Sequence, residues 1–384
     1  MLKPDRISCL LILLIGTSVF GQGENSDLKW LKDVQRPPTA EVNFDVGTME
    51  PLLVLKDGTV VLNRADWLER RRELISAWDN FLGPNLQTPV GTETQLLKRE
   101  SVGDVVRELI RYECEPNLFV EAYLIRPSKI AEGGRLPGIV ALHHTTPDTI
   151  DETAGVSGPE SRMLGLKLAR RGFIVICPRC FLWQDSPSLT QAVENFRTRH
   201  PKSLGMRKML FDARRAVDIL VSHPLVDRTR IGAVGHSLGA KEVMYLAAFD
   251  DRIKAAVASE GGTALKSTNW DAPWYLGPQI HEPTFTRNHH ELLALVAPRA
   301  FLVLGGESGP GAADGDRSWP LISAALPVYK LYPFAPRLGL LNHGEGHTIT
   351  DAVYERLAEW LQTYLSPKAV AALNLDSEQV DKKQ

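Results

Sequence analysis

The chain has few cysteines, no excess of charge of one sign and no long apolar run. Four cysteines occur in 384 residues, too few for the disulfide framework of a small secreted domain. Lys and Arg number 44 and Asp and Glu 46, a formal net charge of −2, which argues against a protein that coats nucleic acid or an anionic membrane. Hydrophobic residues are 43% and charged residues 23%, which is ordinary globular usage and excludes disorder or a fibrous repeat.

The first segment has the pattern of a secretory signal. Lys3 and Arg6 precede an apolar run over 9–20, which is too short to span a bilayer. Val19 and Gly21 are small enough for the −3 and −1 sites of a signal peptidase. We therefore predict a signal peptide over 1–21 and a secreted or periplasmic protein with no membrane contact after cleavage. An uncleaved membrane anchor is the alternative.

The remaining cysteines are Cys114, Cys177 and Cys180. Cys177 and Cys180 have the spacing of a redox or zinc motif, but no second pair completes a zinc site. We interpret them as buried small side chains at a strand end, with one disulfide in an oxidising compartment as the alternative.

The periodicity of apolar residues divides the chain into four parts. Residues 22–99 are rich in proline and charge and form an N-terminal extension packed on the main domain, with a helix over 67–81. The main domain covers 100–366, and a flexible tail covers 367–384.

Within the main domain, the runs 104–113 and 118–126 have the pattern of a hairpin. Short apolar runs then alternate with segments of helical spacing. The runs typical of buried strands are 136–142, 173–177, 230–235, 253–259 and 300–304. This order predicts an α/β fold: a doubly wound, mostly parallel sheet with helices on both faces.

One motif carries chemistry. Gly235-His236-Ser237-Leu238-Gly239 is a G-x-S-x-G that follows an apolar strand and precedes a helix. A sharp turn from strand to helix crowds the backbone, so both flanking positions must be small, and the turn lifts the serine hydroxyl above the sheet. We therefore interpret Ser237 as a nucleophile. The alternative is a helix start with serine as its cap.

A serine nucleophile needs a base, and His347 is our candidate because it lies after the last strand and just before the final helix. We interpret His343, nearer the strand end, as structural. Gly344 and Gly346 make a helical metal pair of these two histidines unfavourable. We predict no metal and no cofactor. The other histidine pairs, which also lack partners at ligand spacing, are His143-His144 and His289-His290.

The third member of a triad must orient the imidazole. Asp316, at the start of the helix after run 300–304, and Glu260, directly after run 253–259, are equally good candidates. In the same loop as Asp316, Asp314 has the alternative role of a turn residue, and Glu307 that of a supporting acid.

Two N–H donors should hold the developing oxyanion. We expect one from Leu238 and the other from His144 or Thr145, while His143 is a candidate for a structural role.

Aromatic and basic side chains beside the same sheet edge are candidates for substrate contact. Trp270 and Trp274 lie in a loop after Glu260, where they would stack on a sugar or line an acyl pocket. Arg179, after run 173–177, would reach the same mouth. The alternative for these residues is simple loop packing.

The order of strand, His-His-Thr-Thr loop, GHSLG turn, acid loop and late histidine resembles the α/β-hydrolases. Within them, the chain is similar to the bacterial dienelactone-hydrolase-like and acetyl xylan esterase-like enzymes. This resemblance implies a secreted esterase that acts on a polysaccharide side chain.

A second resemblance is to the glucuronoyl esterases. That family has a lysine four and a glutamate twenty-three residues after the serine, as Lys241 and Glu260 stand here after Ser237. The resemblance implies that Lys241 contacts the sugar. The family has arginine directly after the serine, whereas this chain has Leu238, a departure that bears on uronate specificity.

The combined interpretation is a serine carboxylic ester hydrolase whose partner is a small-molecule or polysaccharide ester and not a nucleic acid. A serine peptidase and a binding protein with a degenerate triad are the alternatives from other classes.

Overall fold

The computed structural model describes residues 29–184 and 186–381. Its centre is a nine-stranded sheet in the order β1-β2-β3-β5-β4-β6-β7-β8-β9. The first three strands and the β3–β5 pair are antiparallel, and all later pairs are parallel. This confirms the predicted fold class. The strands are β1 (Thr94–Val102), β2 (Val105–Glu115), β3 (Leu118–Pro127), β4 (Leu136–Leu142), β5 (Ile174–Pro178), β6 (Val226–His236), β7 (Ile253–Ser259), β8 (Ala300–Gly305) and β9 (Leu338–Asn342).

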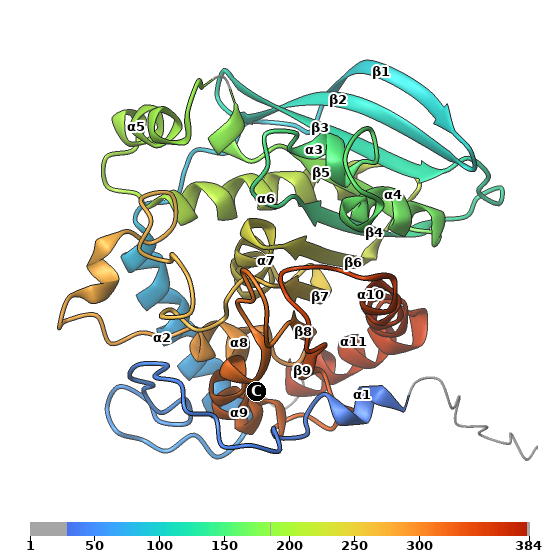
Figure 1. The fold of residues 1–384 in the computed structure, drawn as a ribbon. Coiled ribbons are helices and arrows are strands. Elements are labelled where there is room, and N and C mark those ends of the chain that lie inside the picture. Colours follow the sequence, from blue (N-terminus) through green and yellow to red (C-terminus); the bar gives the residue numbers. More distant parts are fainter. Residues whose placement is uncertain (1–28, 185, 382–384) are drawn as a thin grey trace, which may run out of the picture.

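Helices cover both faces of this sheet (Figure 1). Successive side chains of β4 alternate between the two cores, since Val140 packs with the first and Ile139 and Ala141 with the second. The main-domain helices of the first core are α5 (Leu189–Arg199), α6 (Gly205–Ser222), α7 (Leu238–Phe249), α8 (His290–Val296) and α9 (Trp319–Tyr329). Those of the second are α3 (Ile150–Thr153), α4 (Leu164–Arg170) and α10 (Asp351–Tyr364). Short 3₁₀ turns occupy Glu160–Arg162, Phe181–Trp183, Pro278–His281 and Gly315–Ser318.

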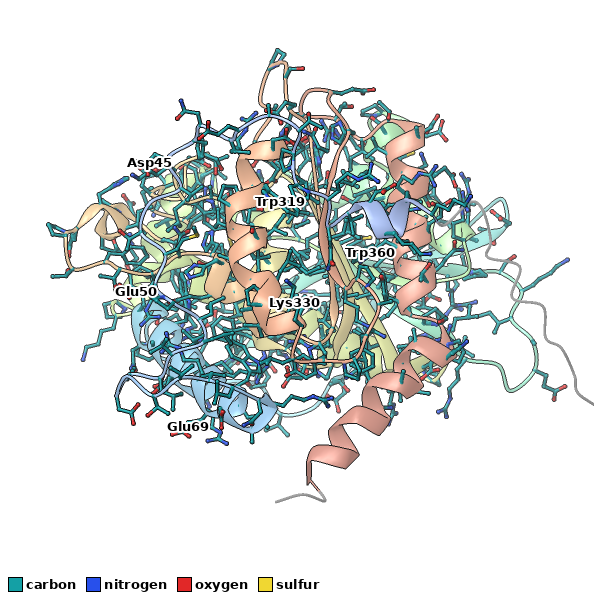
Figure 2. The ribbon with its side chains drawn as sticks, turned by 90° about the horizontal axis from the view of Figure 1, so that it is seen from below. Asp45, Glu50, Glu69, Trp319, Lys330 and Trp360 are labelled. Carbon is teal, nitrogen blue, oxygen red and sulfur yellow. The ribbon has the colours of Figure 1, made fainter. Side chains whose placement is uncertain are left out.

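The N-terminal extension packs against the main domain through α1 (Trp30–Asp33) and α2 (Arg64–Leu82). Figure 2 shows α1 between α9 and α10, where the ring centroids of Trp30 and Trp360 are 6.3 Å apart. In α2, Trp78 stacks on His289 with a centroid distance of 5.9 Å. The extension therefore packs against α10 and against the residue that precedes the helix His290–Val296.

Two boundaries differ from the sequence prediction. β1 begins at Thr94, so the sheet takes in the end of the segment that we assigned to the extension. We expected a flexible tail over 367–384, whereas the structure describes helix α11 over Pro367–Asp381. Proline suits the first turn of a helix, and Val370 and Leu373 are buried, so the segment gains stability by packing.

The compartment prediction rests on residues 1–21, which lie outside the described residues. Cys114, Cys177 and Cys180 are free and buried, as the interpretation of small core side chains requires. Within residues 29–184 and 186–381, no helix is long and apolar enough to cross a membrane.

Candidate active site

The turn between β6 and α7 holds Ser237 in a strained conformation. Its φ of 56° lies in the left-handed region that side chains other than glycine rarely adopt. A Cβ on Gly235 would collide with the backbone of Gly239, and a Cβ on Gly239 would collide with the carbonyl oxygen of Leu142. Both glycines of the motif are therefore sterically required, and the serine stands at the end of β6, as a nucleophile elbow demands.

Ser237 lines a cavity of about 170 Å³ at the carboxyl ends of the parallel strands. Segments that follow six strands, β4 to β9, contribute to this cavity, as expected for a ligand site in a doubly wound sheet. Its walls are Thr145, Leu182, Leu189, Ser237, Leu238, Lys241, Glu260, Gly261, Thr268, Asn269, Trp274, Tyr275, Gly311, Ala313 and His347.

Glu260 is a buried carboxylate in this cavity, with only 1% of its surface exposed. It follows β7 directly and, like Ser237, has a φ of 56°. Its Oε2 accepts a hydrogen bond from the Ala313 N–H at 2.9 Å, and its Oε1 accepts one from the Gly306 N–H. These backbone donors fix the orientation of the carboxylate and compensate its burial.

The aspartates of the loop after β8 lie elsewhere. Asp316 Oδ1 accepts from Asn342 Nδ2 at 2.7 Å on the exposed side of the loop, and Asp316 is not part of the cavity wall. Asp314 is buried and accepts from the Gly262 and Thr263 N–H groups at 2.9 and 2.6 Å. Sequence reasoning left Asp316 and Glu260 equal, whereas the structure brings only Glu260 to the cavity of Ser237.

The two late histidines both lie near Glu260. His347 lines the cavity, and its ring centroid is 4.5 Å from that of His236. Arg162 Nη2 donates to the His347 carbonyl at 3.2 Å. His343, whose side chain is 5% exposed, has Nε2 3.2 Å from Glu260 Oε1. The residue that we interpreted as structural is thus a direct neighbour of the carboxylate, which sequence spacing did not reveal.

Burial lowers the pKa of His347 from its usual value of 6.5, and the negative charge of Glu260 opposes this shift. A general base must be neutral, so we expect kcat/KM for an ester to fall only as the pH drops through a midpoint below 6.5. Initial rates measured from about pH 4 to pH 9 in buffers of constant ionic strength give this midpoint. An acidic limb centred above 6.5 would contradict the assignment of His347.

The residues that we expect to supply the oxyanion donors take different positions relative to the cavity. Leu238, the first residue of α7, and Thr145 both line the cavity. His144 is not in the cavity wall; its ring Nε2 lies 3.1 Å from Glu152 Oε2, and burial lowers its pKa to about 4. Of the two residues that sequence reasoning offered for the second donor, Thr145 is the one in the cavity wall.

Lys241 lines the cavity although it is only 4% exposed. Its Nζ donates to the Gly261 carbonyl at 2.6 Å and to Thr268 Oγ1, and lies 4.0 Å from the centre of the Trp270 ring. Burial lowers the pKa of the ammonium group to about 7, while the charge of Asp314 opposes that shift. The ammonium group is therefore held in place by its neighbours and is not a solvated residue of the first helical turn.

The remaining candidates for substrate contact lie in different places, and only one of them lines the cavity. Trp274 lines the cavity. Trp270 is fully buried behind Lys241, and its Nε1 donates to the Gly262 carbonyl at 2.7 Å. Arg179 is not brought to the cavity, because its guanidinium is bound to Glu121 at 3.2 Å and to Thr149 Oγ1 at 3.1 Å.

Sequence reasoning missed several lining residues. Leu182, Leu189, Thr268 and Asn269 reach the cavity from loops and from the start of α5. No motif marks them, since their position depends on how these segments fold over the sheet edge. Within the described ranges, no group of three or more His, Cys, Asp or Glu side chains is arranged to hold a metal ion.

The sheet order, the strained serine turn and the cavity at the carboxyl edge define the class of structure: the chain has the α/β-hydrolase fold. Residues 120–286 match the Dienelactone hydrolase family. A Bacillus subtilis protein described as a candidate hydrolase, YtaP, is 32% identical over 165 residues. That match covers 41% of this chain and 53% of YtaP, so the chain spans about half the length of this relative.

Solved structures share the fold at low sequence identity. A glucuronoyl esterase from Solibacter usitatus superposes with a TM-score of 0.70 at 17% identity, over 85% of this chain and 100% of that one. A glucuronoyl esterase from Teredinibacter turnerae gives 0.62 at 19% identity, over 83% and 89%. A Bacteroides fragilis protein described as a candidate acetyl xylan esterase gives 0.58 at 15% identity, over 77% and 79%. These similarities establish the fold.

Proposed function

We propose that this protein is a serine carboxylic ester hydrolase with Ser237, His347 and Glu260 as its catalytic triad. The observation that carries the proposal is that the strained Ser237 turn shares one small cavity with His347 and the buried Glu260. The serine, the histidine and the acid lie on three different loops, and the fold alone does not require them to be close together. Their presence at one cavity therefore favours nucleophilic catalysis.

In the proposed reaction, Ser237 Oγ attacks the ester carbonyl carbon while His347 accepts its proton. The N–H groups of Leu238 and Thr145 stabilise the tetrahedral oxyanion. His347 then gives the proton to the leaving alcohol, and an acyl-Ser237 ester remains. Water attacks this ester with His347 again as the base, which releases the acid and restores the serine. Glu260 stabilises the imidazolium formed in each half.

The walls of the cavity favour an ester of a carbohydrate. Lys241, Thr268 and Asn269 offer polar groups beside the rings of Trp274 and Tyr275, a combination that suits hydroxyl groups on an apolar sugar face. A volume of about 170 Å³ admits a small acyl group or one sugar residue. We therefore propose an acetylated glycan as substrate, in keeping with the acetyl xylan esterase-like interpretation.

A second candidate is a glucuronoyl ester, in which the sugar supplies the acid. It is favoured by the position of Lys241 and Glu260 in one cavity with Ser237, the set of residues that carries the resemblance to glucuronoyl esterases. The presence of Leu238 at the position where that family has arginine weakens this second candidate.

A substrate panel separates these candidates. We expect turnover of acetylated xylan and a small aryl acetate, and none of peptide chromogens. Lys241→Met, which keeps the length of the side chain, should raise KM for the glycan about tenfold because a buried polar contact is lost, with little change for the aryl acetate. Preferred turnover of methyl glucuronate esters would favour the second candidate, and peptide cleavage would contradict an esterase.

We also propose that the protein is exported, on the basis of the signal-like pattern in residues 1–21. N-terminal sequencing of protein produced in a bacterial host should start near residue 22, and an intact Met1 in the exported protein would contradict cleavage.

A further inference from the structure

His143 lies directly after β4 and outside the triad. Only 3% of it is exposed. The Cys180 N–H donates to its Nε2 at 3.0 Å, and its Nδ1 lies 2.7 Å from the carbonyl oxygen of His144. Since Nε2 accepts a hydrogen bond, the proton of the neutral ring is on Nδ1, which donates to that carbonyl. Burial lowers the pKa of His143 to about 4, so the ring stays neutral in this tautomer near neutral pH.

The carbonyl that His143 holds belongs to a peptide unit with a second function. The His144 C=O and the Thr145 N–H form one planar trans unit and point in opposite directions. Fixing the oxygen therefore fixes the direction of the N–H. Thr145 lines the cavity of Ser237, and its N–H has no hydrogen-bond partner among the residues that the structure describes. A hydrogen bond to the carbonyl also polarises the peptide and strengthens its N–H as a donor.

The loop is also held from its other side. Glu152 Oε1 accepts from Thr146 Oγ1 at 3.0 Å, and its Oε2 lies 3.1 Å from His144 Nε2. Of the residues on either side of Thr145, Thr146 is thus hydrogen-bonded to this buried carboxylate and His144 lies close to it. This arrangement restricts the loop, whereas within the part of the chain that the structure describes His143 provides the side-chain hydrogen bond to the peptide unit that contains the Thr145 N–H.

We propose that His143 is a positioning residue that orients the Thr145 N–H toward the oxyanion formed on attack by Ser237. The inference rests on the proposed esterase function and extends it to a residue outside the triad. His143 contacts neither the substrate nor the reacting atoms, and it acts only through the His144–Thr145 peptide.

Two matched variants separate this role from simple packing. Glutamine places its amide near Nε2, so His143→Gln can keep an acceptor for the Cys180 N–H but loses the donor to the His144 carbonyl. Asparagine places its amide near Nδ1, so His143→Asn keeps the donor and loses the acceptor. We expect kcat for an aryl acetate to fall about 10- to 100-fold in His143→Gln, with KM within about twofold, because loss of a whole oxyanion donor costs about 10²–10³. His143→Asn should stay within about threefold of the parent in kcat.

The inhibition constant of an aryl boronic acid, which forms a tetrahedral adduct on serine, should rise in His143→Gln by the factor by which kcat falls. Equal kcat losses in both variants, or an unchanged inhibition constant in His143→Gln, would overturn the inference. If His143→Gln does not fold, the kcat of His143→Asn is the deciding measurement. A hundredfold loss of kcat in that variant would contradict the positioning role of His143. A parent protein without ester turnover would overturn the proposed function itself, and the inference with it.

Discussion

Replacement of Ser237 by alanine is expected to abolish ester hydrolysis, with a fall in kcat of at least about 10⁴-fold. The hydroxyl is the proposed nucleophile, and no other hydroxyl of the cavity stands in the strained turn at the end of β6. Alanine is the appropriate substitution because serine and alanine bear the same backbone strain at a φ of 56°. The measurement is the initial rate with an aryl acetate.

The control for this variant is its stability. The elbow shows no side-chain capping hydrogen bond from Ser237 at the start of α7, so the thermal midpoint of Ser237→Ala should match that of the parent. A serine-reactive fluorophosphonate should label the parent and not the variant. Turnover or labelling that persists in folded Ser237→Ala would remove Ser237 from the mechanism.

Replacement of Glu260 by glutamine should have the second largest effect. The buried carboxylate accepts two backbone N–H groups and lies beside His343. A glutamine keeps the shape, but it loses the charge that stabilises an imidazolium and turns an NH₂ toward a backbone donor. We expect kcat to fall about 10³- to 10⁴-fold, as for other triads whose carboxylate is neutralised.

The pH profile gives a second readout for Glu260. Its charge raises the pKa of His347 against the lowering effect of burial. Removing that charge should move the acidic limb of kcat/KM to lower pH, because the imidazole then becomes still harder to protonate. An effect of glutamine on folding alone would not displace the limb.

Asp316→Asn is the matched control. Asp316 binds Asn342 on the exposed side of its loop and takes no part in the cavity wall, so kcat should stay within about threefold of the parent. A loss as large as that of Glu260→Gln would restore Asp316 as the orienting acid. Equal mild losses in both variants would show that neither residue holds this role alone.

Local steric demands made the serine turn predictable from the sequence. Gly235 is required by the backbone of Gly239, four residues later, and the apolar strand and the helix on either side are short-range patterns. The alternation of buried runs and helical segments gave the fold class for the same reason. The segment after residue 366 has no such short-range pattern. Burial of Val370 and Leu373 stabilises a helix there that the spacing of apolar residues did not predict.

The choice among the carboxylates needed the three-dimensional fold. Asp316 and Glu260 are equally good candidates in the sequence, and only the folding of the 306–313 loop over the end of β7 gives Glu260 its two backbone donors. Arg179 shows the opposite case, because a cation beside the expected mouth pairs with Glu121 instead.

The sequence by itself therefore determined the fold class, the strained turn and a histidine after the last strand, since each depends on residues close together in the chain. The tertiary structure decided which carboxylate, which residue of the loop after β4 and which aromatic side chains share the cavity with Ser237. These depend on contacts between loops that follow different parallel strands, and nothing within a single loop specifies which loop it will meet.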